Sequence, residues 1–182
     1  MKGTVGAAAS LTVLSQPRAR AAGEKVIIGV MGLGGRGTFL AEKFAQRPDV
    51  EIAYLCDPNT RRFARAREVV EEAQETRPKM VQDFRKILDD KSVDALINAT
   101  PDHWHGLGTI MACQAGKDVY VEKPMAHNIF EGRKMIEAAR KYKRVVQVGM
   151  QCRSAPYTIP ARPKNISSRA KWVTFTSSAY SI

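Results

Sequence analysis

The chain has 182 residues, of which 44% are hydrophobic and 26% charged, as is typical of a soluble globular protein with one full core. Its formal net charge of +11 is high, but residues 1–23 and 153–182 hold three and five basic residues and no acidic one, which leaves +3 for residues 24–152. A nucleic-acid-binding surface is normally a basic stripe on the folded body, so this distribution argues against a nucleic-acid partner. The three cysteines are widely spaced and odd in number, which argues against a disulfide framework or a zinc site.

Residues 1–23 have the pattern of an export leader. The run GTVGAAASLTVL is apolar but too short to span a bilayer comfortably, and Ala19 and Ala21 after it fit the small-x-small pattern of a cleavage site. The segment is similar to the latter half of a twin-arginine leader, so we expect an exported, periplasmic protein without stable membrane insertion. The alternative is a disordered, alanine-rich arm on a cytoplasmic protein. In either case we expect the fold to begin at residue 24.

From residue 24 onward, short apolar runs alternate with segments of helical spacing. The runs that predict strands span 25–31, 50–56, 79–83, 94–100, 117–124 and 145–150. The segments that predict helices span 38–46, 60–75, 84–90, 105–116 and 129–142, with Thr60 as the expected cap of the second. Strands separated by helices indicate crossover connections, so the sequence predicts an α/β fold with a doubly wound parallel sheet of the Rossmann type over residues 24–152.

The first predicted strand runs into a glycine-rich motif, Gly32-Leu33-Gly34-Gly35-Arg36-Gly37, which fits G-x-G-x-x-G. Between a strand and a helix, Gly32 permits the tight turn, Gly34 lets the backbone approach a pyrophosphate and Gly37 permits close packing. The N-terminus of the following helix attracts the anion. We therefore expect the motif, including Gly35 and Arg36, to bind a dinucleotide.

Asp57 follows the second predicted strand, 20 residues beyond Gly37. A carboxylate at that position accepts hydrogen bonds from the adenosine ribose hydroxyls, and it repels a 2′-phosphate, which favours NAD. Arg61 and Arg62 lie close by and leave NADP possible, because a guanidinium accommodates that phosphate. The other interpretation of these arginines is that they are solvated charges on a charged helix.

The fourth predicted strand ends in the segment NATPDHWHG, Asn98 to Gly106. Ligands of open α/β sheets bind outside the carboxyl ends of the strands, so we expect Asp102, His103, Trp104 and His105 near the nicotinamide position. Two histidines two positions apart on a loop, without further ligands in evidence, do not predict a metal site.

The fifth predicted strand ends in Glu122, Lys123 and Pro124, followed by His127. These residues form either a solvated turn or part of a reactive site. A lysine that is partly desolvated beside a cationic nicotinamide ring has a lowered pKa and could transfer protons, which an alcohol oxidation by hydride transfer requires. The residue chemistry alone leaves both interpretations open.

These four motifs occur in one order along about Lys25 to Arg153: G-x-G-x-x-G, Asp57, TPDHWH and EKP. In this order they resemble the Gfo/Idh/MocA oxidoreductases, which include glucose–fructose oxidoreductase and inositol dehydrogenase. The resemblance implies an N-terminal Rossmann domain that binds NAD or NADP. It also implies hydride transfer to or from a small-molecule sugar or polyol. The TPDHWH form is similar to the exported sugar-oxidoreductase branch.

The resemblance also implies roles for individual residues. Lys123 would be catalytic beside the substrate and the nicotinamide, and the Lys123–Pro124 peptide would be cis. Glu122 would contact the nicotinamide ribose. The remaining implied contacts are with the cofactor, from Thr100, Pro101 and His105, and with cofactor or substrate, from Gln151 and Arg153.

Members of this family are longer and carry a second α/β domain that forms the substrate wall and the oligomer interface. WVTFTSSAY, within residues 153–182, resembles the first strand of that domain. We therefore expect only the beginning of a second domain in this chain. The implied aspartate and histidine of the proton relay would lie beyond it, and the homo-oligomer of the full-length family is not expected for the chain itself. A non-catalytic dinucleotide-binding remnant or sensor is the alternative.

Overall fold

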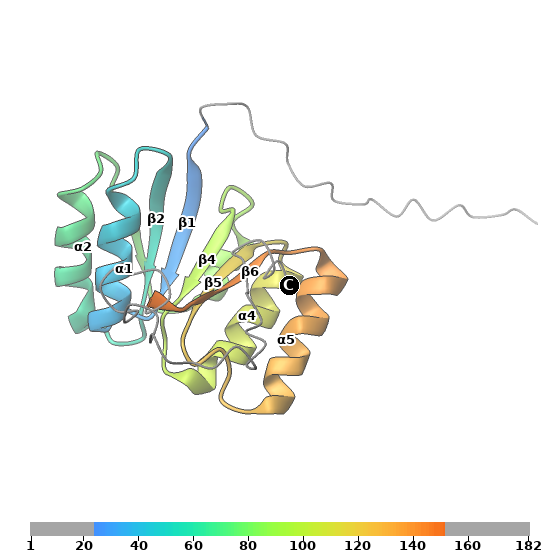
Figure 1. Ribbon diagram of the computed structural model, residues 1–182. Helices are drawn as coiled ribbons and strands as arrows, with labels where there is room; N and C mark the ends of the chain where they lie inside the picture. Colours follow the sequence, from blue (N-terminus) through green and yellow to red (C-terminus); the bar gives the residue numbers. More distant parts are fainter. Residues whose placement is uncertain (1–23, 152–182) are drawn as a thin grey trace, which may run out of the picture.

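A computed structural model describes residues 24–151 and contains one six-stranded sheet (Figure 1). The strands are β1 (Val26–Met31), β2 (Val50–Cys56), β3 (Lys79–Val81), β4 (Ala95–Asn98), β5 (Asp118–Glu122) and β6 (Val146–Gly149). All pairings are parallel, and the strand order is β3-β2-β1-β4-β5-β6. Each strand lies within a run that the sequence predicted, and the doubly wound Rossmann topology is confirmed.

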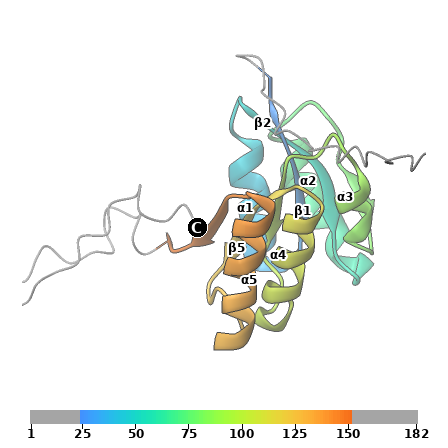
Figure 2. The ribbon, with the colours of Figure 1, turned by 90° about the vertical axis from the view of Figure 1, so that its right-hand side faces the viewer.

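Helices cover both faces of the sheet. They are α1 (Gly35–Ala45), α2 (Phe63–Glu71), α3 (Arg85–Asp89), α4 (His105–Gln114) and α5 (Ile129–Tyr142), with short 3₁₀ turns η1 (Thr60–Arg62) and η2 (Asp102–Trp104). Figure 1 shows α1 and α2 beside the β1–β2 half, and Figures 1 and 2 both show α4 and α5 side by side. No helix in the described range is long and apolar enough to cross a membrane.

The core consists of two clusters, one on each face of the sheet. One cluster joins β1 and β2 to α1 and α2, and the other joins the sheet to α3, α4 and α5. Successive strand residues point to opposite faces, so Leu96 belongs to one cluster and its neighbour Ile97 to the other. Strands buried on both faces explain why the predicted runs are continuously apolar rather than alternating.

The second helix differs from the prediction at both ends. The predicted helix starts as the 3₁₀ turn η1, which Asn59 rather than Thr60 caps, because Asn59 Oδ1 accepts a hydrogen bond from the backbone N–H of Arg61 at 3.1 Å. The helix α2 itself begins at Phe63 and has no side-chain cap. The helix ends at Glu71, and Gln74 beyond it turns back toward β2. Gln74 Nε2 donates to the carbonyl of Ile52 at 3.0 Å, and the N–H of Ile52 donates to Gln74 Oε1 at 2.9 Å. The ladder between β2 and β3 begins only at Tyr54, so the Gln74 amide pairs the backbone of β2 just before β3 does.

Two predicted segments lie outside the described residues. They are the leader over 1–23 and the start of a second domain over 153–182, which includes Arg153. Both stay predictions.

Candidate functional site

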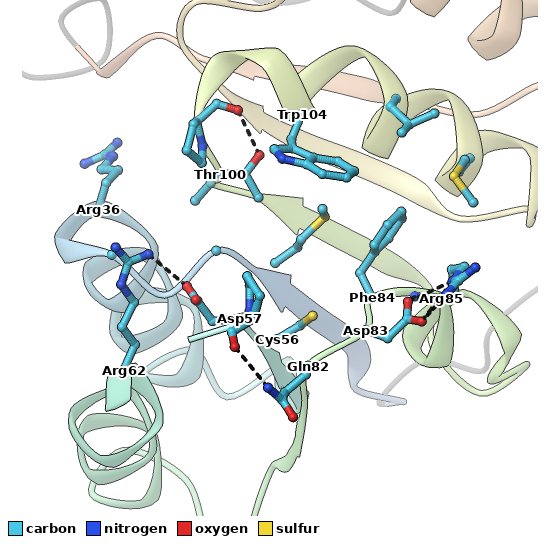
Figure 3. Close-up of a pocket in the computed structure, with 18 of the residues that line it drawn as sticks. Arg36, Cys56, Asp57, Arg62, Gln82, Asp83, Phe84, Arg85, Thr100 and Trp104 are labelled. Atoms are coloured by element: carbon cyan, nitrogen blue, oxygen red, sulfur yellow. Dashed lines mark hydrogen bonds and ion pairs between the residues drawn. The ribbon is translucent and has the colours of Figure 1, made fainter. Parts of the chain in front are cut away.

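A cavity of about 980 Å³ opens at the carboxyl ends of β1, β2 and β4 (Figure 3). This is the edge at which open α/β sheets bind ligands, and the volume is in the range of a small-molecule or cofactor site. The predicted site residues that line it are Gly32, Gly34, Gly35, Arg36, Asp57, Thr100 and Pro101. Those that do not line it are Gly37, His105, Glu122 and Lys123.

The glycine-rich loop brings the backbone of α1 to the cavity. Gly32 has φ +89°, in the left-handed region, and a Cβ there would lie 2.8 Å from the backbone of Ala99. A Cβ on Gly37 would lie 1.7 Å from the carbonyl oxygen of Gly32, so this close helix–strand contact requires glycine. Gly34 has open space where its Cβ would be, and no side chain caps α1 or places an acid in its first turn. The free N–H groups of α1 are therefore available to an anion.

Asp57 lies directly after β2 and joins the glycine loop to the start of η1. Its Oδ2 accepts from Arg62 Nη1 at 3.1 Å (Figure 3). The same oxygen accepts from the N–H of Leu33 at 2.8 Å, and Oδ1 accepts from the N–H of Asn59 at 2.9 Å. The residue is only 2% exposed. A carboxylate has about four acceptor positions, so these three donors leave one for a ligand hydroxyl.

Arg62 is the positive group that lies closest to this carboxylate. Its side chain is 49% exposed and lines the cavity beside Asp57. Arg61 is exposed and is not on the cavity wall. Of the two arginines that left NADP possible, the structure therefore places Arg62 on the cavity wall beside Asp57.

Apolar side chains line another part of the cavity; the sequence led us to expect Trp104 near the cofactor but not Phe84. Phe84 follows β3, Trp104 lies in η2, and both project toward the same hollow from opposite sides (Figure 3). Leu107 and Met111 of α4 complete this wall. The sequence did give one indication of Phe84. The segment after β3 also leaves the carboxyl edge of the sheet, where ligands bind, and so could have been expected to line the cavity.

Cys56, the last residue of β2, also borders the cavity but is only 2% exposed. Burial raises the pKa of its thiol to about 12, and the negative charges of Asp57 and Asp83 contribute. The thiol therefore carries its proton at neutral pH and acts as a small apolar group in the wall.

At the end of β5, the carboxylate of Glu122 is buried whereas the side chain of Lys123 is exposed. Glu122 is 4% exposed, and its Oε1 accepts from Arg36 Nε at 2.7 Å. Its Oε2 accepts from the N–H of Lys123 at 3.2 Å. Lys123 is exposed, and the Lys123–Pro124 peptide is cis, as the resemblance implied. The direct contact of Glu122 with a ribose stays a prediction, because the described carboxylate is turned to Arg36.

His105 is buried beneath the loop rather than placed on the cavity wall. The residue is 1% exposed, and its ring nitrogens lie 2.6 Å from the carbonyl oxygen of Pro124 and 2.9 Å from that of Thr100. This placement differs from the expectation that the ring lines the cofactor. The reason is that His105 is the first residue of α4 and its ring is turned inward to two backbone carbonyls.

The other polar groups of this loop are exposed. Asp102 Oδ2 lies 3.3 Å from His127 Nδ1, which holds the pKa of the Asp102 carboxyl below its usual value. His103 Nδ1 lies 3.8 Å from Asp102 Oδ1. No group of three possible metal ligands occurs in residues 24–151. Gln151 is exposed just beyond β6.

The comparisons with known proteins agree with this geometry. The family model described as "Oxidoreductase family, NAD-binding Rossmann fold" matches residues 26–150. The chain belongs to the Gfo/Idh/MocA oxidoreductase family. The resemblance stated from the four motifs is thereby confirmed, and NAD is the cofactor of the matched domain.

Individual relatives cover a similar part of the chain. A glycosyl hydrolase family 109 protein of Stenotrophomonas maltophilia is 36% identical over 122 residues, which are 64% of this chain and 27% of the relative. An alpha-N-acetylgalactosaminidase of Shewanella oneidensis is 29% identical over 122 residues, 65% of this chain and 27% of the relative. The chain thus spans about a quarter of the length of these curated relatives.

Among solved structures, the WlbA dehydrogenase of Bordetella pertussis, in complex with NADH and UDP-GlcNAcA, is similar. The identity is 28% and the TM-score 0.62, over 72% of this chain and 36% of that one. The residues of this Gfo/Idh/MocA chain fit a dinucleotide, since an uncapped helix N-terminus, a tight glycine loop and a carboxylate with a free acceptor position border one cavity.

Proposed function

We propose that the chain is the cofactor-binding part of an NAD-dependent enzyme that acts on a sugar or polyol by hydride transfer. The observation that carries the proposal is the shared edge of the sheet, where the glycine loop, Asp57, the Thr100 loop and Lys123 all follow the carboxyl ends of strands. The relatives' names support a carbohydrate substrate, because they name glycosyl hydrolases and an alpha-N-acetylgalactosaminidase.

Each element has a separate task in this proposal. The uncapped N-terminus of α1 binds the pyrophosphate, and Asp57 accepts from a ribose hydroxyl. NAD, when bound, supplies a hydride acceptor. Lys123 takes the proton of the substrate hydroxyl, since its side chain is exposed at the end of β5 and free to meet a substrate. Arg36 pairs with Glu122 and so neutralises the buried carboxylate next to Lys123.

A second candidate is glycoside cleavage, which the glycosyl hydrolase names of the relatives favour. Sugar oxidation and glycoside cleavage differ in whether NADH accumulates. Oxidation of a free sugar produces one NADH for each product, whereas hydrolysis of a glycoside releases the substituent without net NADH. A cofactor-binding sensor without turnover is the third candidate.

The test has two steps. The 182-residue chain is titrated with NADH, and saturable binding is expected. Residues 26–150 of this chain then replace the matching segment of the full-length Stenotrophomonas relative, and the chimera is supplied with NAD and a panel of sugars, polyols and aryl glycosides. NADH formation supports oxidation, and release of the aryl group without NADH supports glycoside cleavage. A chimera that binds NADH and turns over no panel member would favour the sensor, and a chain that does not bind NADH refutes all three.

We also propose export of the protein, with the apolar run and the Ala19 and Ala21 pattern as support. Fractionation of cells that produce the chain with its natural upstream sequence tests this. Recovery from the cytoplasm alone, with residues 1–23 uncleaved, would contradict it.

A further inference from the structure

The ring of His105 joins the two loops that leave β4 and β5. Its Nδ1 lies 2.6 Å from the carbonyl oxygen of Pro124, and its Nε2 lies 2.9 Å from the carbonyl oxygen of Thr100. Carbonyl oxygens only accept, so the ring acts as a donor here. A neutral ring has one N–H and donates to one carbonyl at a time, whereas a doubly protonated ring donates to both. At 1% exposure, water does not compete for either contact.

The loop that carries Thr100 is held together independently of β5. Thr100 Oγ1 donates to Asn98 Oδ1 at 2.7 Å, and Asn98 Nδ2 lies 3.3 and 3.4 Å from the carbonyl oxygens of Trp104 and His105. Asn98 is 0% exposed. Residues 98–105 therefore form one closed unit, and the ring of His105 attaches the Pro124 turn to it.

An exposed contact joins the same two loops. His127 Nδ1 lies 3.3 Å from Asp102 Oδ2, with side chains 56% and 40% exposed. Such a pair in water contributes little to position. Of these two contacts, the buried link through His105 is thus the stronger, and it acts on Pro124, which follows Lys123 directly.

We propose that His105 is a positioning residue that fixes Lys123 relative to the Thr100 loop and thereby shapes the nicotinamide end of the site. The identity of the ligand rests on the proposed function. The link between the two loops is independent of the proposed function, because His105 contacts both loops within the chain itself.

The first test compares ligands that differ only at the nicotinamide end. In His105→Gln the amide nitrogen takes the place of Nε2, so the donor toward Thr100 remains and the donor toward Pro124 is lost. We expect the Kd of NADH to rise about tenfold, as for one lost hydrogen bond, and that of ADP-ribose, which lacks nicotinamide, to change less than about twofold. His105→Asn keeps a donor at the place of Nδ1 and should restore NADH binding. His103→Gln, at an exposed neighbour, is the matched control.

The second test needs no ligand. Hydrogen–deuterium exchange of the 182-residue chain should rise over residues 122–128 in His105→Gln and stay unchanged over residues 32–38. Equal loss of NADH and ADP-ribose affinity, or faster exchange over both segments, would show a general structural role and overturn the proposal. Unchanged affinity and exchange would overturn it as well.

A third measurement uses the wild-type chain alone, in case the variants do not fold. A ring N–H of His105 should appear in the proton NMR spectrum as a slowly exchanging signal correlated with Nδ1 or Nε2. Its absence would contradict the link. If the wild type binds neither NADH nor ADP-ribose, the proposed function fails, while the exchange and NMR results still decide the role of His105.

Discussion

Arg36 and Glu122 form an ion pair that joins the two ends of the site. Arg36 Nε donates to Glu122 Oε1 at 2.7 Å, although the two residues are 86 positions apart in the chain. Arg36 begins the helix after β1 and Glu122 ends β5, so the pair passes over β4, which lies between those strands. The glycine loop and the strand that carries Lys123 are therefore coupled directly.

Replacement of Arg36 tests this coupling. Arg36→Met leaves Glu122, at 4% exposure, without its cationic partner, so we expect a loss of about 1–2 kcal/mol in the free energy of unfolding, reduced by the partial exposure of Arg36. Urea unfolding of Arg36→Met, Glu122→Gln and the double variant measures the coupling energy. Arg65→Met, which breaks an exposed pair with Glu68, is the control and should leave the free energy of unfolding nearly unchanged. Additive effects at Arg36 and Glu122 would refute the coupling.

Replacement of Asp57 tests the ribose contact. Asp57→Asn keeps an oxygen for the N–H of Leu33 but removes the negative charge, so we expect the Kd of NADH to rise about tenfold and that of NADPH to rise less or to fall. Fluorescence titration of both cofactors measures this. Asp83→Asn, at another carboxylate of the cavity wall, is the matched control. If Asp57→Asn weakened the binding of NADH and NADPH equally, Asp57 would not be the residue that binds the ribose hydroxyls.

Replacement of Lys123 separates binding from chemistry. In the active chimera, Lys123→Met should lower kcat by about two to four orders of magnitude, the usual contribution of a general acid–base group. The Kd of NADH should change less than about threefold, because Lys123 does not line the cavity. Lys134→Met, at an exposed lysine of α5, serves as the control. Retained turnover in Lys123→Met would exclude the catalytic role.

The buried thiols give the fold a specific dependence on alkaline pH. Burial raises the pKa of Cys56 to about 12 and that of Cys113 to about 11, whereas a thiol in the unfolded chain has a pKa of about 8.5. Above pH ~8.5 the thiols lose their protons in the unfolded chain and keep them in the folded chain. The stability that the thiols contribute is therefore complete below that pH and is lost as the pH rises toward 11–12. The free energy of unfolding, measured with urea at a series of pH values from neutral to alkaline, should fall less steeply with pH in the Cys56→Ala, Cys113→Ala double variant than in the wild type. Identical slopes would contradict the raised pKa values.

Lys117 should affect the fold and not the site. It is 3% exposed, and its Nζ donates to the carbonyl oxygens of Asp90 at 2.6 Å and Val93 at 2.8 Å, before β5 begins. Lys117→Met removes the side-chain donor of both carbonyls, and the Asp90 carbonyl keeps only the backbone N–H of Val93 at 3.3 Å, so we expect about 1–3 kcal/mol of destabilisation with NADH affinity unchanged below the melting temperature. Thermal unfolding and NADH titration of the same sample measure both, with Lys91→Met as the exposed control. A change in NADH affinity would show that the two edges of the sheet are coupled.

The sheet and the glycine loop were predictable because their signals are local. The apolar runs locate all six strands, and the left-handed Gly32 follows from the motif alone. The end of α2 was not predictable, because Gln74 leaves the helical pattern to pair with Ile52, 22 positions earlier. A contact between a side chain and the backbone of an earlier strand leaves no local periodicity in the sequence.

The directions in which the side chains at the site point could not be predicted from local sequence either. The motifs place His105 and Glu122 at the correct edge of the sheet. Whether each faces the cavity depends on partners far along the chain, Pro124 for His105 and Arg36 for Glu122. Phe84 was missed for the opposite reason, since a single aromatic after a short strand carries no motif.

The central place of β1 in the sheet affects the order in which the protein acquires its function during synthesis. The ribosome releases β1, β2 and β3 first, and these three strands are neighbours, so they can pair with α1 and α2 before β4 emerges. The cavity also needs Thr100, Trp104 and Met111, which come later. A nascent chain can therefore build half of the sheet without a ligand site, and a bound nucleotide stabilises only chains that have passed this point.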